Sequence, residues 1–262
     1  MSHYVKKYGL LIICLFLVIL YFKAPFPIQA EDGSKEKNIL VLCYHRVIPK
    51  PTSDYDLTPE QLEAHFQYFM SNGYTPITAR QFLEYRKKPA LFPEKPIILT
   101  FDDGSKSHYT QVLPLLKKYG FKATFYLFTN AIMHGSKERW LTWEEVMEIS
   151  KAGMDIGSHT VTHPYLTARN KMDEQQYKVW LEKELTQSKK VLEEKLNIPV
   201  NTLAYPFGLY DTEVEAAAIR AGYTGMLTLN AGLNGLRDNP HRMKRRIMVN
   251  SIGPKSLEKI LN

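Results

Sequence analysis

Short apolar runs alternate with segments of helical periodicity from position 39 to the end of the chain. The apolar runs predict seven strands: Ile39 to Tyr44, Ile97 to Phe101, Ala123 to Phe128, Met154 to Gly157, Thr202 to Tyr205, Gly225 to Leu229 and Ile247 to Asn250. Their short length is typical of barrel strands. Strands that alternate with helices in one chain of 262 residues predict a single α/β domain built on a parallel sheet, open or closed.

Helix signals fill the gaps between these runs. Thr58 and Gln61 form a capping box with proline at the first helical position, and apolar residues follow at helical spacing up to Gly73. A second helix opens at Thr142 and stops at Gly153. Two more are predicted over Glu174 to Leu196 and Thr212 to Ala221. Ligands of parallel α/β proteins gather at the carboxyl ends of the strands, so polar residues directly after the apolar runs are the first candidates for a site.

The first 30 residues have the pattern of an export signal. Lys6 and Lys7 precede an uncharged apolar run from Gly9 to Phe22, and Ala30 ends the segment. The run has 14 residues, fewer than the ~20 that cross a bilayer comfortably. A signal cleaved after Ala30 is therefore favoured over an uncleaved anchor, and both alternatives stay open. We expect residues 1–30 to be this signal or anchor, 31–38 a linker and 39–262 the catalytic domain, with membrane contact only through the N-terminal segment.

Charge and cysteine content indicate a location and exclude one class of partner. Without residues 1–30 the chain loses three lysines and no acidic residue, so its net charge falls from +7 to +4. This mild excess is typical of a solvated lysine-rich surface and also suits an anionic envelope. Basic residues concentrate only near Arg242, so nucleic-acid binding is not expected. Cys43 then remains alone, and an exported protein without a disulfide suits a bacterial envelope.

Two adjacent carboxylates end the second predicted strand, in the sequence Thr100-Phe101-Asp102-Asp103-Gly104. Two such charges are costly to hold together, which predicts a cation beside them. The alternative is that both aspartates cap the following helix while Gly104 makes the turn. For this segment alone, the capping interpretation would be the better one.

Two histidines four positions apart, His159 and His163, follow another short apolar run. Pro164 argues against a helix here, so the pair is expected where a strand exits into a loop. Taken alone, the pair could be a turn histidine and a core histidine. Together with one carboxylate it makes a three-ligand site for a divalent metal, with a position open for water. If Asp103 is the third ligand, Asp102 must point elsewhere and is free to act as a base.

These motifs resemble those of a known enzyme family. Thr-Phe-Asp-Asp-Gly, His-Thr-Val-Thr-His-Pro and the segment Ala204-Tyr205-Pro206-Phe207-Gly208 are similar to the first three motifs of the polysaccharide deacetylases, the family-four carbohydrate esterases with a NodB-homology domain. The resemblance extends from about Ile39 to Asn250. It implies a distorted (β/α) barrel of about seven parallel strands that removes N-acetyl groups from N-acetylhexosamine polymers, usually with zinc, with cobalt or nickel as alternatives.

The resemblance also implies roles for individual residues. Asp102 would be the catalytic base, and Asp103, His159 and His163 the metal ligands. Substrate contacts would come from the third motif, where the backbone N–H of Phe207 helps to hold the oxyanion. The remaining substrate-binding candidates in this motif are Tyr205, Pro206 and Gly208, with Tyr205 and Phe207 as aromatic rings that could stack on sugars.

The sequence departs from the family pattern in two places. The family usually has arginine at the position of Ala204, where it pairs with the base, and it usually ends with a Leu-x-His motif that supplies the general acid. Here no such motif precedes Asn262, and the fourth motif is not recognisable around Leu227 to Leu236. Arg246, just before the last predicted strand, is the candidate to replace the arginine. Arg245 is nearly as suitable, and the alternative is that the whole cluster is solvated.

The missing acid has a candidate near the N-terminus. His45 follows the first predicted strand, in an arrangement similar to the permuted poly-β-1,6-N-acetylglucosamine deacetylases of biofilm systems. Imidazole can protonate a leaving amine near neutral pH, so His45 is the expected general acid. The alternative is a partly exposed histidine at a strand end.

These features together predict an exported, extracytoplasmic bacterial metalloenzyme that acts as a monomer. The favoured substrate is poly-β-1,6-N-acetylglucosamine, and the alternative is peptidoglycan or chitooligosaccharide. An alternative of another class is a non-catalytic envelope protein that binds glycan. Ala204 and the missing fourth motif are the features that motivate this alternative.

Overall fold

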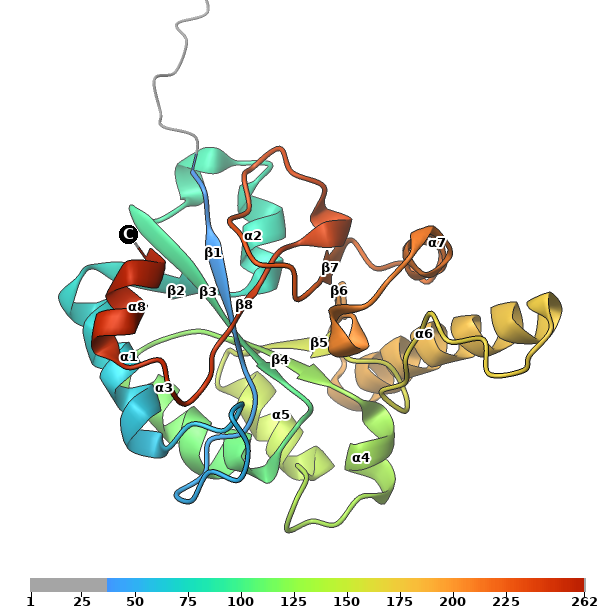
Figure 1. The fold of residues 1–262 in the computed structure, drawn as a ribbon, viewed down its shortest axis with the longest axis horizontal. Coiled ribbons are helices and arrows are strands. Elements are labelled where there is room, and N and C mark those ends of the chain that lie inside the picture. The colour runs from blue at the N-terminus through green and yellow to red at the C-terminus, as the bar shows by residue number, and fades with distance from the viewer. Residues whose placement is uncertain (1–36, 262) are drawn as a thin grey trace, which may run out of the picture. The chain divides into compact units, whose positions relative to one another are not determined.

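One parallel sheet of eight strands is the centre of the computed structural model, which describes residues 37–261 (Figure 1). Seven strands follow one another in the order β7-β6-β5-β4-β3-β1-β8, and β2 pairs with the first half of β3 on the edge that β4 occupies further along. The strands are β1 (Leu40–Tyr44), β2 (Tyr74–Ile77), β3 (Lys95–Asp102), β4 (Thr124–Leu127), β5 (Asp155–Ser158), β6 (Thr202–Ala204), β7 (Gly225–Leu227) and β8 (Arg246–Ile247).

The sheet curls into the distorted barrel that the resemblance implies. The chain from Met243 to Ile247 links its two edges, because Met243 pairs with Leu227 of β7 while Ile247 pairs with Cys43 of β1. Each of the seven predicted strands overlaps a strand of the structure, although the last one, predicted over Ile247 to Asn250, shares only Ile247 with β8. The sequence did not predict β2, since Pro76 lacks the N–H that a central strand needs and so hides the strand pattern.

Helices cover the outer face of the curled sheet, and α6 projects beyond it (Figure 1). The predicted helices are confirmed as α1 (Pro59–Ser71), α5 (Trp143–Lys151), α6 (Glu174–Leu196) and α7 (Thr212–Arg220). Capping boxes start the first three of these, and the one formed by Thr58 and Gln61 was predicted. The others are α2 (Ala79–Tyr85), α3 (Leu113–Tyr119), α4 (Thr129–His134) and α8 (Pro254–Leu261), with short turns η1 (Pro89–Leu91), η2 (His108–Val112), η3 (Pro206–Gly208) and η4 (Pro240–Arg242).

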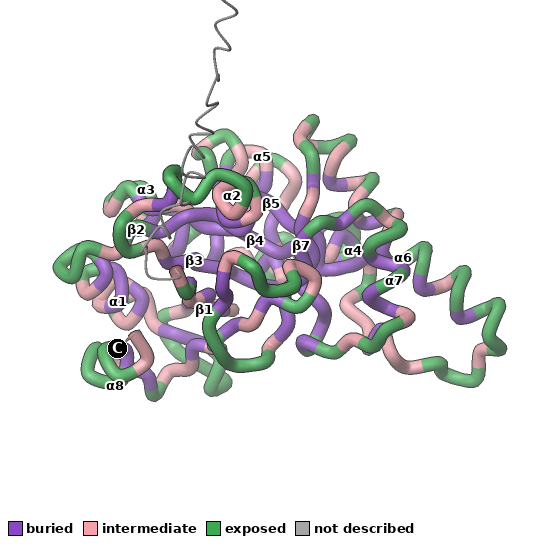
Figure 2. Tube along the Cα trace, turned by 90° about the horizontal axis from the view of Figure 1, so that it is seen from above, coloured by how far each residue is buried: buried purple, intermediate pink, exposed green. Residues whose placement is uncertain are grey.

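Alternation along the strands sorts side chains between two cores, and the strands are mostly buried (Figure 2). Leu42, Leu99 and Phe101 point outward to the helices, whereas Val41 and Ile98 point into the barrel. Because the side-chain period is two, the residues that follow Val41 and Ile98 at even spacing also face the interior. This register places Cys43, His45, Thr100 and Asp102 on the concave face.

The predicted signal segment, residues 1–30, and most of the predicted linker lie outside the described residues. Within 37–261, the search for a helix that is both long and apolar enough to cross a bilayer finds none. The described residues belong to one compact unit.

Candidate active site

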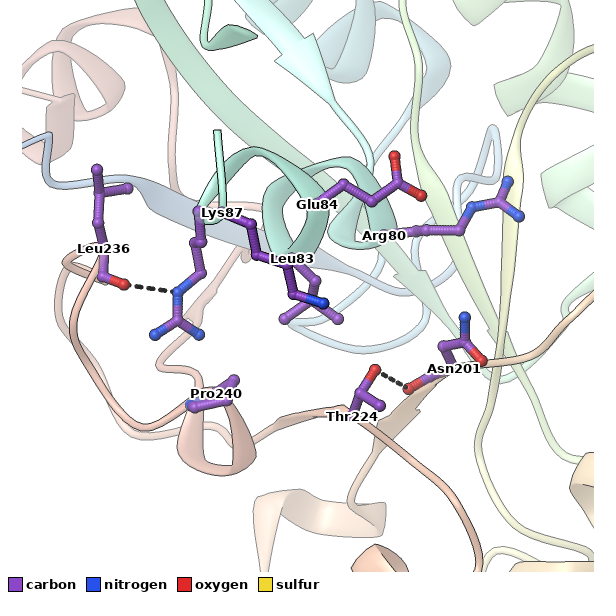
Figure 3. Close-up of a pocket in the computed structure, with 9 residues that line it drawn as sticks. Arg80, Leu83, Glu84, Lys87, Asn201, Thr224, Leu236 and Pro240 are labelled. Atoms are coloured by element: carbon purple, nitrogen blue, oxygen red, sulfur yellow. Dashed lines mark hydrogen bonds between the residues drawn. The ribbon is translucent and has the colours of Figure 1, made fainter. Parts of the chain in front are cut away.

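Two of the larger cavities lie at opposite ends of the strands. Figure 3 shows the one near the amino ends, lined by Arg80 and Glu84 of α2, by Lys87 just after this helix, and by Asn201 and Thr224, which precede β6 and β7. Glu84 is the single acidic residue among its lining side chains, and no histidine lines it, so this cavity does not offer a metal site. The second cavity, of about 520 Å³, lies at the carboxyl ends. Its lining residues are His45, Tyr55, Asp102, Asp103, His159, His163, Tyr205, Phe207, Leu229 and Ile247.

Three predicted metal ligands converge in this second cavity. The Nε2 atoms of His159 and His163 are 3.1 Å apart, and they lie 3.6 and 3.5 Å from Oδ1 of Asp103. A tetrahedral ion with bonds of about 2.0–2.1 Å separates its ligand atoms by about 3.4 Å. The three atoms therefore fit one divalent ion, and two nitrogen ligands with one carboxylate are typical of zinc hydrolases.

Groups around the ligands fix their orientation. His159 donates its Nδ1–H to the carbonyl of Ala204 at 2.7 Å, which leaves Nε2 with a free lone pair. Burial and the neighbouring His159 lower the pKa of His163 to about 4, so this imidazole is neutral near pH 7 and can ligate a metal. Ala204, at the position where the family usually has arginine, thus orients a predicted metal ligand through its backbone carbonyl.

The loop that carries His163 is held by a buried side chain of α6. Both carboxylate oxygens of Glu184 accept hydrogen bonds, from the N–H groups of Val161 and Thr162 at 3.0 Å and from the Thr162 hydroxyl at 2.8 Å. The exposed fraction of Glu184 is only 6%. This contact was not predicted, because the glutamate lies 21 positions away from His163 in a helix rich in exposed glutamates.

Backbone strain concentrates at the site. Asp103, Thr160, His163 and Phe207 all have φ between 58° and 79°, in the left-handed region. For residues other than glycine this conformation is costly, by about 1–3 kcal/mol each, and persists only where the surroundings enforce it. The strain turns Asp103 toward the histidines while Asp102 stays in the strand, so the two adjacent carboxylates diverge as expected.

Asp102 lies beneath the three ligands and is almost fully buried, at 2% exposure. Its Oδ1 accepts a hydrogen bond from Arg245 at 2.8 Å, and its Oδ2 lies 3.5 Å from the Cys43 sulfur and 3.9 Å from Nε2 of His159. Burial alone would raise the pKa of Asp102, but Arg245 and then His159 bring the pKa well below its usual range. Asp102 is therefore ionised at neutral pH and able to accept a proton.

The arginine that contacts Asp102 is Arg245, which corrects our choice of Arg246. Arg246 pairs with Leu42, whose side chain faces outward, and Arg246 itself is exposed. The side chain of Arg245 points to the opposite face of the sheet from Arg246 and is fully buried. Its Nε donates to the carbonyl of Thr228 at 2.9 Å, which anchors the guanidinium beneath the pocket.

His45 directly follows β1 and lines the same cavity as His159 and His163. One of its ring nitrogens is within 4.8 Å of both a carboxylate oxygen of Asp102 and the Cys43 sulfur. This second group is a poor metal site, because burial raises the pKa of the Cys43 thiol well above its usual value and Arg245 already neutralises Asp102. His45 is therefore not needed as a metal ligand.

The third motif contributes one exposed ring. Phe207 is 42% exposed, packs edge-on against His163 at 4.6 Å and stacks on Tyr165 with ring centroids 4.0 Å apart. Tyr205 borders the pocket, but its side chain is fully buried and its ring stacks on Tyr210, so it cannot stack on a sugar. Tyr205 directly follows β6 and packs in the outer core, which explains this difference from our expectation.

The other two residues of the motif shape the chain. Pro206 and Gly208 are both buried within η3. At Gly208, φ is +70° and an added Cβ would meet the backbone nitrogen of Leu229 at 2.5 Å, so only glycine fits. Two aromatic residues at the mouth, Tyr55 and Tyr165, were not predicted, since neither lies in a recognised motif. They are about half exposed, and the Tyr55 ring lies 5.6 Å from His45.

Comparison with known proteins agrees with this geometry. The sequence profile of the family described as polysaccharide deacetylase matches residues 91–226. The chain belongs to this family. YxkH of Bacillus subtilis (strain 168), which carries the family's name, is 31% identical over 201 residues, covering 76% of this chain and 67% of YxkH. Polysaccharide deacetylases are hydrolases, so the predicted enzyme class is confirmed.

Two further relatives extend the comparison. The poly-β-1,6-N-acetyl-D-glucosamine N-deacetylase of Staphylococcus aureus (strain MSSA476) is 26% identical over 227 residues, covering 75% of this chain and 77% of that protein. The solved structure of the Streptococcus pyogenes deacetylase PplD, in complex with acetate, matches with a TM-score of 0.78 and 25% identity, covering 87% of this chain and 100% of PplD. In this member of the polysaccharide deacetylase family, the predicted metal ligands lie at the carboxyl ends of parallel strands.

Proposed function

We propose that this polysaccharide deacetylase removes N-acetyl groups from N-acetylglucosamine residues of an extracellular polysaccharide, and that the polymer is poly-β-1,6-N-acetylglucosamine. The convergence of Asp103, His159 and His163 beside an ionised Asp102 carries the proposal, because it brings together a metal site and a base. The choice of polymer is supported by the Staphylococcus aureus relative and by the position of His45 on the first strand.

The residues of the pocket divide the reaction between them. Asp103, His159 and His163 would hold a divalent ion, which we propose is zinc and which would supply Lewis acidity to the reaction. Asp102 takes a proton from the attacking water as the new C–O bond forms at the carbonyl carbon. The backbone N–H of Phe207 donates to the developing oxyanion. His45 protonates the nitrogen as the C–N bond breaks, so that acetate and a glucosamine unit leave.

The remaining walls suit this substrate. Leu229 and Ile247 form an apolar side of the cavity that fits the acetyl methyl group, in place of the fourth motif that the sequence lacks. The exposed Phe207 and Tyr165 rings offer a flat surface for a sugar ring. The product gains positive charge. Because the substrate is an extracellular polymer, we also propose that the protein acts outside the cytoplasm, delivered by residues 1–30.

Acetate release tests the proposal directly. The fragment from Glu31 onward is incubated with β-1,6-linked and β-1,4-linked N-acetylglucosamine oligomers, with added zinc or with a chelator. We expect release from the β-1,6 series that the chelator abolishes, and replacement of Asp102 by asparagine should remove turnover while leaving glycan affinity nearly unchanged. Release only from β-1,4 oligomers would move the substrate to peptidoglycan or chitin.

No release from either series would instead favour a protein that only binds glycan. The main argument for that alternative was the missing motif arginine, and Arg245 contacts Asp102 in its place.

A further inference from the structure

We propose that Ser107 and His108 are positioning residues that hold the backbone of His45 in place, so that the imidazole of His45 stays aimed at the leaving nitrogen. The inference rests on the proposed role of His45 as general acid. Neither residue touches the pocket, and neither belongs to a motif of the family resemblance.

Two hydrogen bonds bracket His45 along the chain. The Nε2–H of His108 donates to the carbonyl oxygen of His45 at 2.9 Å. Two residues further on, the N–H of Val47 donates to the Ser107 hydroxyl at 3.1 Å, and that hydroxyl also contacts Ser105 Oγ at 3.0 Å. Strand β1 ends at Tyr44, so the ladder to β3 no longer holds the backbone at His45. Where the sheet stops, these two side chains hold the backbone at His45 and Val47, while Leu57 bonds to the backbone of Arg46 and Ile48.

His108 is built to act as a fixed donor. It is fully buried, and its ring packs against Phe101 and Phe125 with centroids 5.7 and 5.5 Å away. Burial lowers the pKa of His108 to about 4, so the ring is neutral near pH 7 and carries one N–H. A carbonyl partner requires that this proton sits on Nε2. The ring therefore has one tautomer and little freedom to move.

The local helix geometry is also unusual. Residues His108–Val112 form a π-helix, a wider turn that is rare and often found at functional sites. It starts five residues after Asp103, so one short segment carries a metal ligand at its beginning and the two positioning residues at its end. This segment thereby helps to set the distance between the proposed metal site and the proposed acid.

Substrates with different leaving groups can isolate this role. An amide of glucosamine needs a proton on the departing nitrogen, whereas the phenolate of 4-nitrophenyl acetate leaves without one. General acid catalysis contributes about 10²–10⁴-fold. We expect His108→Phe, which keeps an aromatic ring between Phe101 and Phe125, to lower kcat on N-acetylglucosamine oligomers by about tenfold or more, with KM changed less than twofold. Ester hydrolysis and zinc affinity should stay within about twofold of the wild-type protein.

Three further variants make the comparison sharp. His65→Phe is the control, because His65 is equally buried and contacts the carbonyl of Ile252 at 2.8 Å and the Tyr44 hydroxyl at 3.2 Å without lining the pocket. It should leave the amide-to-ester ratio unchanged. Ser107→Ala should lower the ratio in the same direction with a smaller effect, and His108→Gln, which retains an N–H donor, should partly restore it. In a His45→Gln background, His108→Phe should cause no additional loss on the amide.

Several results would overturn the proposal. One is an equal loss on amide and ester, and another is the same change in His65→Phe; each would mean a general structural effect. Additive losses in the double variant would mean that His108 does not act through His45.

An activity-independent readout is the ¹H–¹⁵N spectrum of the histidine side chains of the zinc-loaded protein. If the wild type releases no acetate, the proposed function fails, yet the positioning is still decided by this spectrum. Displaced His45 signals in His108→Phe support it, and unchanged ones refute it.

Discussion

The contact between Arg245 and Asp102 joins two charges in the interior of the barrel, at 0% and 2% side-chain exposure. Such a pair is costly to break, since the remaining charge has neither water nor a counter-ion. Replacing Arg245 by alanine leaves the buried Asp102 carboxylate without water or a counter-ion. The neighbouring Arg246 provides a matched control, because it carries the same charge and lies on the exposed side of β8.

We predict that Arg245→Ala lowers the free energy of unfolding by about 3–5 kcal/mol at pH 7.5, whereas Arg246→Ala changes it by less than about 0.5 kcal/mol. In the variant, burial raises the pKa of Asp102, so the acidic limb of the pH–kcat/KM profile should move to higher pH. Urea unfolding and acetate release measure both effects. An unchanged profile in Arg245→Ala, or an equal effect in Arg246→Ala, would contradict the assignment.

Residues inside local motifs could be predicted, and residues whose role depends on direction could not. Asp102, Asp103, His159 and His163 lie in two short segments, and the structure brings them together as expected. The choice between Arg245 and Arg246 depended on the register of a strand of two residues, too short for any alternation to be read from the sequence. Tyr165 belongs to the site because it meets Phe207, which lies far along the chain.

At the level of elements, the long helix α6 has a function that its sequence conceals. Its surface carries many charged residues, and Glu184 differs from the rest in being buried against the loop from Thr160 to His163. This one carboxylate fixes the loop that presents a metal ligand. Groups that orient ligands in this way are commonly worth 10–100-fold in metal affinity, as an order of magnitude.

We therefore predict that Glu184→Ala weakens zinc binding by about 10–100-fold, because the two loop N–H groups and the Thr162 hydroxyl lose their shared acceptor. Glu184→Gln keeps one acceptor oxygen and should lose less. Titration of zinc against a competing chelator measures the affinity. Glu182→Ala, on the exposed side of the same helix, is the control; equal affinities in the Glu182 and Glu184 alanine variants would argue against this role.

Elements with their own start and stop signals were predictable, except α2, which was missed although Thr78 and Gln81 form a capping box. Capping boxes at Thr58 and Thr142 and glycines after the helix ends placed α1 and α5 within a residue or two. Strand β2 was missed because of its proline, and α3 because it continues a π-helix without a side-chain cap. Where tertiary contacts rather than local signals define an element, the sequence alone gives no boundary.

On the scale of the whole molecule, the two ends of the barrel differ in how well their buried aspartates are paired with arginine. At the carboxyl end, Asp102 is paired with a buried arginine, which keeps it ionised. At the amino end, Asp155 begins β5 and is just as buried, but its partner Arg80 is partly exposed and 3.3 Å away. Oδ2 of Asp155 has no hydrogen-bond partner within the described residues. The amino end thus carries a charge that destabilises the fold.

This asymmetry predicts how stability depends on pH. Burial raises the pKa of Asp155 to about 6 from an ordinary value of 3.8. The folded state therefore binds this proton more tightly than the unfolded chain, and stability falls as the pH rises from 3.8 through 6. The shift corresponds to about 3 kcal/mol at most above pH 7.

Replacing Asp155 by asparagine removes the charge and keeps the shape, so we expect Asp155→Asn to be more stable than the wild-type protein above pH 7. Below the ordinary carboxyl pKa the two proteins should be equal, because the aspartate is then protonated in both states. Urea unfolding of both proteins at several values between pH 4 and pH 8 measures the difference. A constant difference across this range would mean that the effect comes from packing, and a less stable variant at pH 8 would mean that the pairing with Arg80 outweighs the cost of burial. We expect instead that the stability difference between Asp155→Asn and the wild-type protein rises with pH. This result would show that the amino end of the barrel tolerates an unfavourable charge of the kind that Arg245 neutralises at the carboxyl end.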